Sequence, residues 1–231
     1  MVMRLEKVVP FGRSLDEYIK MFDLSQSDFQ SKILGVGDGP ASFNAEATQL
    51  GYHVTSIDPI YQFTGAEIFA RFQEVVDGII EQVRQTPNDW VWKYHKSPED
   101  LRQNRVQAIE KFLKDYDLAK QIGRYKLEEL PKLSFADKEY DLALCSHFLL
   151  LYSDFYDYQF HLNSILEMMR VATEVRIFPL LTLMLQRSPH LNPLIAELTQ
   201  LGYTVEIKPV AYQLQKGGHE MLVVKRNGNK E

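Results

Sequence analysis

KILGVGDGP, residues 32–40, is a short apolar run that ends in three closely spaced glycines. The apolar part predicts a buried strand, and Pro40 suits the first turn of a helix that is capped by Gly39. We therefore expect a strand, a tight turn and a helix that extends to about Leu50. A β-rich run, 52–57, follows and predicts a second strand, so that residues 32–58 form one βαβ unit.

The three glycines lie where an open parallel sheet binds its ligands. Ligands bind there because strands end and helices begin at that edge, and residues without side chains let a ligand approach the backbone closely. Gly35, Gly37 and Gly39 occupy this place in the predicted unit. An acidic residue that follows about 20 residues later, at the end of the next strand, can accept hydrogen bonds from both hydroxyls of an adenosine ribose. Asp58 meets this requirement.

The spacing of the glycines distinguishes between two kinds of nucleotide-binding site. A loop that binds a nicotinamide dinucleotide requires G-x-G-x-x-G, and its third glycine allows close packing around a pyrophosphate. Here the third position is Pro40, and the spacing is G-x-G-x-G. A NAD-dependent oxidoreductase is therefore only the third hypothesis for the function.

The rest of the chain alternates between strand and helix signals, which predicts a mostly parallel sheet. Further strands are predicted at 124–127, 140–146, 174–178, 203–210 and 220–225, and helices at 14–30, 158–171 and 193–201. The last two strands flank a glycine turn and suggest an antiparallel edge. Residues 62–121 carry two helical apolar stripes, and this length far exceeds the usual connection of about 2 to 6 residues. We read them as a helical insertion.

Composition limits the classes of partner. The 26 Lys and Arg are scattered among 31 Asp and Glu, for a net charge of −5. Binding of nucleic acid irrespective of its sequence needs clustered cations, so a small-molecule partner is favoured over nucleic acid. Cys145 is the sole cysteine, which excludes an internal disulfide and a zinc site built from several thiolates. No metal is expected, because no His, Cys or carboxylate groups have metal-ligand spacing.

The length and hydropathy of the chain predict its organisation and location. At 231 residues, it fits one α/β domain, 1–231, with the insertion at about 62–121. No stretch approaches the roughly 20 apolar residues that a membrane span requires. Residues 1–10 carry charges among their apolar residues and do not form a signal peptide. We expect a cytoplasmic protein without membrane association.

The glycine turn, Asp58, the strand at 140–146 and the late hairpin resemble those of class I S-adenosylmethionine (SAM)-dependent methyltransferases. Residues 146–149, 176–180 and 215–218 are also similar to an uncharacterised bacterial subgroup of methyltransferases. The resemblance implies a Rossmann-like, doubly wound α/β fold with a mostly parallel seven-stranded sheet and an antiparallel last strand. It also implies SAM as the cofactor, lying over the glycine turn, and a methyl acceptor above the strand that ends at Ser146.

The resemblance also defines a candidate site. Many family members carry an acidic residue at the position of Ile33 and an acidic adenine contact near Lys126, and this chain lacks both. Asp38, Glu128 and Glu129 are the candidates to substitute for them. The predicted cofactor-binding residues are Gly35, Gly37, Asp38, Gly39, Asp58, Glu128, Glu129 and Ser146.

His147 is the candidate catalytic residue. It directly follows the fourth strand, where an imidazole with a near-neutral pKa can remove a proton from the acceptor. A purely structural role for His147 is an equal alternative, and Arg13 is read as either a surface residue or a contact of the methionine carboxylate of SAM.

The sequence thus predicts a SAM-dependent methyltransferase that acts on a small molecule by in-line methyl transfer. A SAM- or adenosine-binding module without catalysis is the alternative. The insertion acts either as a lid over the site or as the interface of a homodimer.

Overall fold

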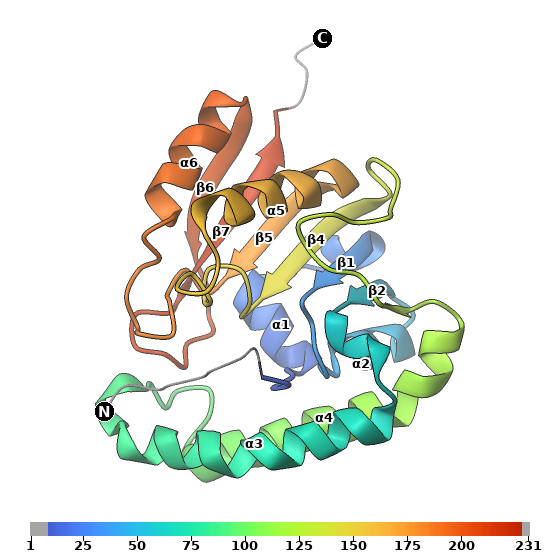
Figure 1. Ribbon diagram of the computed structural model, residues 1–231, viewed down its shortest axis with the longest axis vertical. Helices are drawn as coiled ribbons and strands as arrows, with labels where there is room; N and C mark the ends of the chain where they lie inside the picture. Colours follow the sequence, from blue (N-terminus) through green and yellow to red (C-terminus); the bar gives the residue numbers. More distant parts are fainter. Residues whose placement is uncertain (1–8, 228–231) are drawn as a thin grey trace.

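A seven-stranded sheet with the order β3-β2-β1-β4-β5-β7-β6 forms the centre of the computed structural model, which describes residues 9–227 (Figure 1). The strands are β1 (Lys32–Val36), β2 (His53–Ile57), β3 (Tyr125–Lys126), β4 (Tyr140–Ser146), β5 (Ala172–Phe178), β6 (Tyr203–Pro209) and β7 (Glu220–Arg226). Strands β1 to β5 run parallel to one another, whereas β7 runs antiparallel to both β5 and β6. This topology confirms the predicted mostly parallel sheet with an antiparallel last strand. Because β7 lies between β5 and β6, the outermost strand is β6.

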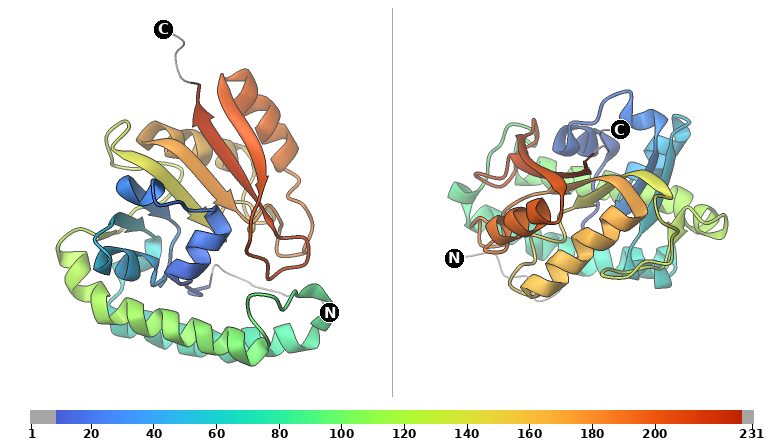
Figure 2. Two further views of the ribbon diagram at one scale, coloured as in Figure 1. Left: turned by 180° about the vertical axis from the view of Figure 1, so that it is seen from behind. Right: turned by 90° about the horizontal axis from the view of Figure 1, so that it is seen from above.

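Helices cover both faces of the sheet and one of its ends (Figures 1 and 2). They are α1 (Leu15–Phe22), α2 (Phe43–Gln49), α3 (Gly65–Gln85), α4 (Pro98–Gln121), α5 (Tyr158–Val171) and α6 (Leu191–Gln200). Helices α5 and α6 lie on one face, and α1 and α2 lie on the other. The long pair α3 and α4 crosses the end of the sheet toward which the parallel strands point. This pair fills the predicted helical insertion.

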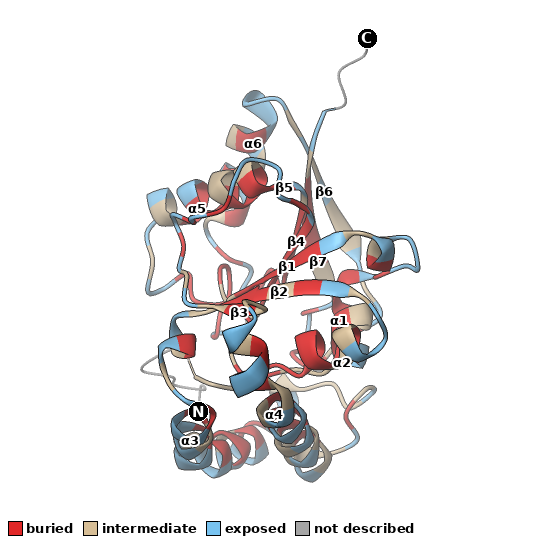
Figure 3. Ribbon diagram, turned by 90° about the vertical axis from the view of Figure 1, so that its right-hand side faces the viewer, coloured by how far each residue is buried: buried red, intermediate tan, exposed pale blue. Residues whose placement is uncertain are grey.

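The buried side chains form two main clusters, one on each side of the sheet (Figure 3). The central strands β1 and β4 contribute to both clusters, because nearly all of their residues are buried. Parallel strands that are covered on both faces are expected to be apolar throughout. In the described part of the chain, no helix combines the length and the apolar character that crossing a bilayer demands.

Side-chain caps explain where the helices around the insertion begin. Thr64 and Glu67 form a capping box at the start of α3, and the Ser97 side chain accepts a hydrogen bond from the backbone of Asp100 at the start of α4. Each cap satisfies backbone N–H groups that have no partner within the helix. The two long helices are therefore encoded locally as separate units.

Two predicted helix boundaries are wrong. The lead-in helix was predicted over 14–30, but α1 ends at Phe22, because Asp23 adopts a left-handed conformation with φ of 48°. The helix after the glycine turn was predicted to be capped by Gly39, but α2 begins only at Phe43. Gly39 has a φ of 53°, whereas a helix cap normally has an extended backbone. Residues 1–8, which belong to the predicted N-terminal segment, lie outside the described residues.

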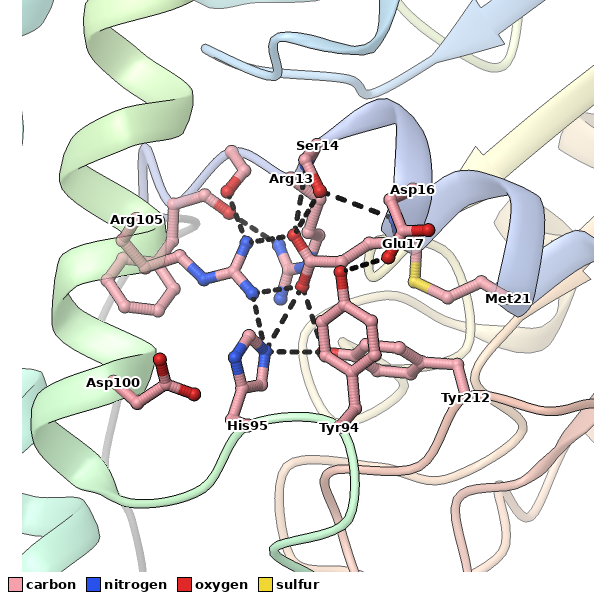
Figure 4. A network of polar contacts seen from close by, with 12 residues as sticks. Arg13, Ser14, Asp16, Glu17, Met21, Tyr94, His95, Asp100, Arg105 and Tyr212 are labelled. Atoms are coloured by element: carbon pink, nitrogen blue, oxygen red, sulfur yellow. Dashed lines mark hydrogen bonds and ion pairs between the residues drawn. The ribbon is translucent and has the colours of Figure 1, made fainter.

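A buried ion pair attaches the insertion to the rest of the protein (Figure 4). Arg105 of α4 and Glu17 of α1 are 1% and 0% exposed, and both terminal nitrogens of Arg105 bond to the Glu17 carboxylate. Arg105 also donates to the backbone oxygen of Gly12 at 2.6 Å. The Glu17 carboxylate accepts a hydrogen bond from the Tyr212 hydroxyl at 3.1 Å, and the His95 ring lies 3.3 Å away.

The charges within this network outweigh the effect of burial. Burial alone would raise the pKa of Glu17, but Arg105 and His95 hold that pKa well below its usual range. Glu17 therefore remains ionised. Removing one partner of such a pair leaves an uncompensated buried charge, which is far more costly than losing an exposed pair.

We predict that Arg105→Ala lowers the free energy of unfolding by about 3 to 5 kcal/mol, because Glu17 then loses its counter-ion in the interior. Arg102→Ala on the same helix is the matched control, since Arg102 pairs with Asp77 at an exposed position. That change should cost no more than about 1 kcal/mol. Denaturant unfolding followed by circular dichroism measures both. Equal losses in the two variants would contradict the assignment of Arg105 as the anchor.

Candidate functional site

A cavity of about 770 Å³ lies at the carboxyl ends of β1, β2 and β4. The glycine turn, the end of β2 and the residues after β4 form one part of its lining, and the helical insertion contributes to another. Of the nine predicted site residues, all except Gly35 line this cavity. The structure thus brings the predicted residues together around one space.

The glycine turn requires glycine at two positions for conformational reasons. Gly37 and Gly39 have φ values of 67° and 53°, in the left-handed region that residues with side chains rarely adopt. Gly37 donates its N–H to the backbone oxygen of Ile57 at 2.9 Å, which joins the turn to the end of β2. The turn therefore presents backbone without side chains to the cavity.

Gly35 is a glycine for a different reason. A Cβ atom at this position would lie 1.8 Å from Oδ2 of Asp38. The Asp38 carboxylate thus occupies the space that a side chain at position 35 would take. Gly35 supports the site by leaving room for this carboxylate and does not itself reach the cavity.

Asp38 is 6% exposed and accepts two short hydrogen bonds. The Tyr18 hydroxyl donates to Oδ1 and the Ser56 hydroxyl donates to Oδ2, each at 2.6 Å. Burial raises the pKa of Asp38 to about 7, with a further contribution from the charge of Asp58, although the two hydroxyl donors oppose this shift. Asp38 is therefore partly ionised at neutral pH.

Asp58 connects the end of β2 to the glycine turn. Its Oδ2 accepts the N–H of Gly39 at 2.8 Å, and its Oδ1 accepts the N–H of Ile60 at 2.8 Å. Burial raises the pKa of Asp58 to about 6, although both backbone donors lower it. At neutral pH, Asp58 is mostly ionised and lies beside the turn, as the spacing of 19 residues from Gly39 predicts.

Glu128 and Glu129 follow β3 and line the cavity from the side of β2. The Glu128 carboxylate accepts hydrogen bonds from the backbone N–H of Ser134, at 3.2 Å, and from the Ser134 hydroxyl. Glu129 is exposed. Glu128 is thus held in place by the protein, while Glu129 is open to solvent.

His147 lies directly after β4 in a strained conformation. Its φ is 51°, which is unfavourable for a residue with a Cβ atom, and its N–H donates to the backbone oxygen of Phe178 at 2.6 Å. The imidazole packs edge to face against Phe178 and Tyr212. Burial lowers the pKa of His147 well below its usual range, and the positive charges of Arg13 and Arg105 add to this effect. The imidazole is therefore neutral at pH 7.

Two polar residues at this site were missed or undervalued by the sequence analysis. Tyr18, which bonds to Asp38, belongs to the apolar stripe of the lead-in helix, and no local signal marks it as a site residue. Arg13 was read mainly as a surface residue, but it is partly buried and lines the cavity. Within residues 9–227 its guanidinium forms no ion pair with a carboxylate.

Apolar side chains line most of the remainder of the cavity, together with the polar residues Gln62, Arg71, Glu74 and Gln215. The apolar side chains come from the N-terminal segment, from α3, from the connection between α3 and α4, and from the segments after β4 and before β7. We call the following six the apolar wall: Phe11, Val75, Ile79, Trp90, Tyr152 and Leu214. In residues 9–227, no group of three or more His, Cys or acidic residues is arranged to hold a metal ion.

Comparison with solved structures finds similar folds at low sequence identity. The magnesium protoporphyrin IX methyltransferase of Synechocystis PCC 6803, solved with bound SAM, is 12% identical over 92% of this chain and 78% of its own, with a TM-score of 0.47. The methyltransferase domain of bacterial CtHen1 is 11% identical over 91% of this chain and 97% of its own, with a TM-score of 0.48. The PH0226 protein of Pyrococcus horikoshii OT3 is 10% identical over 92% of this chain and 91% of its own, with a TM-score of 0.45.

Comparison of sequences finds a much closer relative. No family model matches the chain. The uncharacterized protein MJ0045 of Methanocaldococcus jannaschii is 33% identical over 225 residues, which cover 97% of this chain and 99% of that protein. At this coverage the matched region includes the glycine turn, the insertion and the late strands. The chain therefore belongs to the same family as MJ0045.

Proposed function

We propose that the protein is a SAM-dependent methyltransferase that acts on a small-molecule acceptor. The observation that carries this proposal is the contact between Asp58 and the glycine turn, at the edge of a cavity of about 770 Å³. A carboxylate that accepts one backbone N–H on each oxygen has lone pairs left for the two hydroxyls of a ribose. This pairing at the ends of adjacent parallel strands favours a nucleoside ligand.

The other residues of the turn fit the remaining parts of SAM. Gly37 and Gly39 leave the backbone uncovered, so that the ligand can approach it closely. Arg13, which has no carboxylate partner within residues 9–227, is placed to hold the methionine carboxylate. Glu128 and Glu129, next to the end of β2, are the candidates for contacts with the adenine amino group.

Methyl transfer needs little from the protein besides positioning and a dry site. When bound, SAM supplies an electrophilic methyl group on a positively charged sulfur. The apolar wall excludes water from the acceptor, and α3 contributes Val75 and Ile79 to it. His147 is neutral and can take the proton that the acceptor loses. In this arrangement the insertion selects the acceptor.

A SAM- or adenosine-binding module without catalysis is the alternative. The glycine turn and Asp58 would be sufficient for such a module. The apolar wall and the strained His147 extend beyond any contact that the cofactor requires, and they favour an enzyme. A module would bind SAM and S-adenosylhomocysteine equally well and transfer no methyl group to any acceptor.

We predict that SAM and S-adenosylhomocysteine raise the melting temperature of the protein, because a ligand that binds only the folded state stabilises it by mass action. NADH at the same concentration should have a much smaller effect, since the turn lacks the third glycine of a dinucleotide loop. Differential scanning fluorimetry provides the measurement. Stronger stabilisation by NADH than by either SAM species would exclude the proposed cofactor.

We predict that Asp58→Ala weakens binding of S-adenosylhomocysteine by about tenfold or more, since hydrogen bonds to a charged group contribute about 1.5 to 3 kcal/mol. Isothermal titration calorimetry measures the dissociation constant. Asp137→Ala is the control, because Asp137 is an exposed carboxylate that pairs with Arg170 away from the cavity. Unchanged affinity in a folded Asp58 variant would remove Asp58 from the site.

The same titrations should depend on pH. The pKa of Asp58 is raised to about 6, so its carboxyl becomes protonated as the pH falls below that value. A protonated carboxyl accepts hydrogen bonds less well, and affinity should therefore fall with the pH in this range. Asp58→Asn should lose the part of the pH dependence that is centred near pH 6, and should retain any part that arises from Asp38.

A further inference from the structure

The charges around the cavity are distributed unevenly. The carboxylates among its lining residues are those at the glycine turn, at the end of β2 and after β3, together with Glu74, which is exposed on α3. The N-terminal segment and the segments after β4 and before β7 contribute none. Arg13 and Arg71 line the same cavity. A ligand that packs against the apolar wall therefore meets no buried carboxylate that could balance a positive charge on it. A protonated amine is disfavoured there, and an apolar molecule is favoured.

The apolar wall favours a flat, aromatic body. Phe11, Trp90 and Tyr152 contribute rings to it, and Val75 and Ile79 contribute aliphatic surface from α3. Aromatic partners pack well against such rings, in offset or edge-to-face arrangements. Exclusion of water from this surface also strengthens any polar interaction at its margin.

His147 is a polar group at that margin, and one nitrogen of its ring is bonded to a neighbouring hydroxyl. Its Nδ1 lies 3.0 Å from the Ser146 hydroxyl oxygen. The Ser146 hydroxyl also reaches the Met21 sulfur, at 4.0 Å, which gives it an acceptor other than His147. We assign the proton of the imidazole to Nδ1, so that Nδ1 donates to the Ser146 oxygen and the hydroxyl hydrogen is directed to Met21.

The position of this proton decides what the second ring nitrogen, Nε2, can do. With the proton on Nδ1, Nε2 of His147 keeps its lone pair, and it has no hydrogen-bond partner among the described residues. Nε2 is thus held as a proton acceptor.

We propose that the methyl acceptor is an apolar aromatic alcohol of the phenol or naphthol class, which is methylated on its oxygen while Nε2 of His147 takes the hydroxyl proton. This inference rests on the proposed function and specifies its substrate. The acceptor oxygen forms a bond to the methyl carbon as the carbon–sulfur bond breaks, and the electron pair of that bond remains on sulfur. The proton passes to His147 and then to solvent, so no further reactant is needed. Ser146 acts as a positioning residue for His147.

A matched series of ligands tests this proposal by binding alone. Calorimetry on the protein saturated with S-adenosylhomocysteine compares 2-naphthol, naphthalene, 2-naphthylamine and 2-naphthoate. We expect 2-naphthol to bind about tenfold more tightly than naphthalene, which corresponds to one good hydrogen bond to Nε2. His147→Ala should abolish this preference, and His219→Ala at an exposed position should retain it. Equal binding of 2-naphthol and naphthalene, or a preference that survives His147→Ala, would overturn the proposal.

Measurements of product formation distinguish a role of His147 as a general base from a purely structural role. Mass spectrometry should detect 2-methoxynaphthalene from 2-naphthol, and neither N-methyl-2-naphthylamine nor the methyl ester of 2-naphthoate at comparable rates. His147→Ala should slow the reaction of 2-naphthol by about 100-fold or more, which is typical for loss of a general base. With a nitro-substituted naphthol that is already ionised at the assay pH, His147→Ala should slow the reaction far less, because no proton has to be removed from this substrate. Ser146→Ala should also slow the reaction of 2-naphthol more than that of the ionised naphthol, but by a smaller factor than His147→Ala. Equal losses with both naphthols would contradict the role of Nε2.

Failure of this inference can be distinguished from failure of the proposed function. If S-adenosylhomocysteine does not bind at all, the proposed function is wrong. If it binds, but the amine or the carboxylate is the preferred ligand and the methylated product, the protein is a methyltransferase of another substrate class. In that case only the inference about the acceptor is overturned.

Discussion

Glu17 and Arg105 form a fully buried ion pair, and three segments that lie far apart in the sequence meet around it. Gly12, His95 and Tyr212 each bond to one of the two charged groups. Moving two charges out of water is costly, and the cost is offset here by the bonds of both terminal nitrogens of Arg105, whereas its buried Nε has no hydrogen-bond partner among the described residues. The pair therefore fixes the N-terminal segment, the insertion and the segment before β7 relative to one another. These segments also supply much of the cavity lining, so its shape depends on this one contact.

Anchoring of this kind changes how the insertion is understood. Two long helices over a ligand site suggest a lid, and the sequence alone left that role open beside a dimer interface. The ion pair ties α4 to α1, and α1 packs against the sheet through a buried stripe that includes Tyr18 and Phe22. Moving α4 away would break a buried charge pair. The insertion is better described as a fixed wall of the cavity, and access for an acceptor depends on shorter connecting segments.

The sequence predicted those features that are encoded locally. The glycine turn and Asp58 belong to one βαβ unit, in which the spacing along the chain determines the spacing in space, and the structure places them in contact. The predicted start of α2 was wrong, because a glycine such as Gly39 before a proline is compatible both with a helix cap and with a left-handed turn. The bonds of Tyr18 to Asp38 and of Arg105 to Glu17 were not predictable, since they join separate elements. In the sequence, Tyr18 is part of an apolar stripe, and Arg105 is one charged residue among many on a helix.

Gly35 and Asp38 share one small volume, which the carboxylate of the second residue fills because the first has no side chain. Any larger residue at position 35 would displace this carboxylate from Tyr18 and Ser56, and a smaller residue at position 38 would leave their hydroxyls facing an empty space. We therefore expect the residues at positions 35 and 38 to change together during evolution. An acidic residue at position 35 becomes tolerable only when position 38 is small, and each exchange is harmful without the other. Relatives of this chain should carry one arrangement or the other, with intermediates selected against.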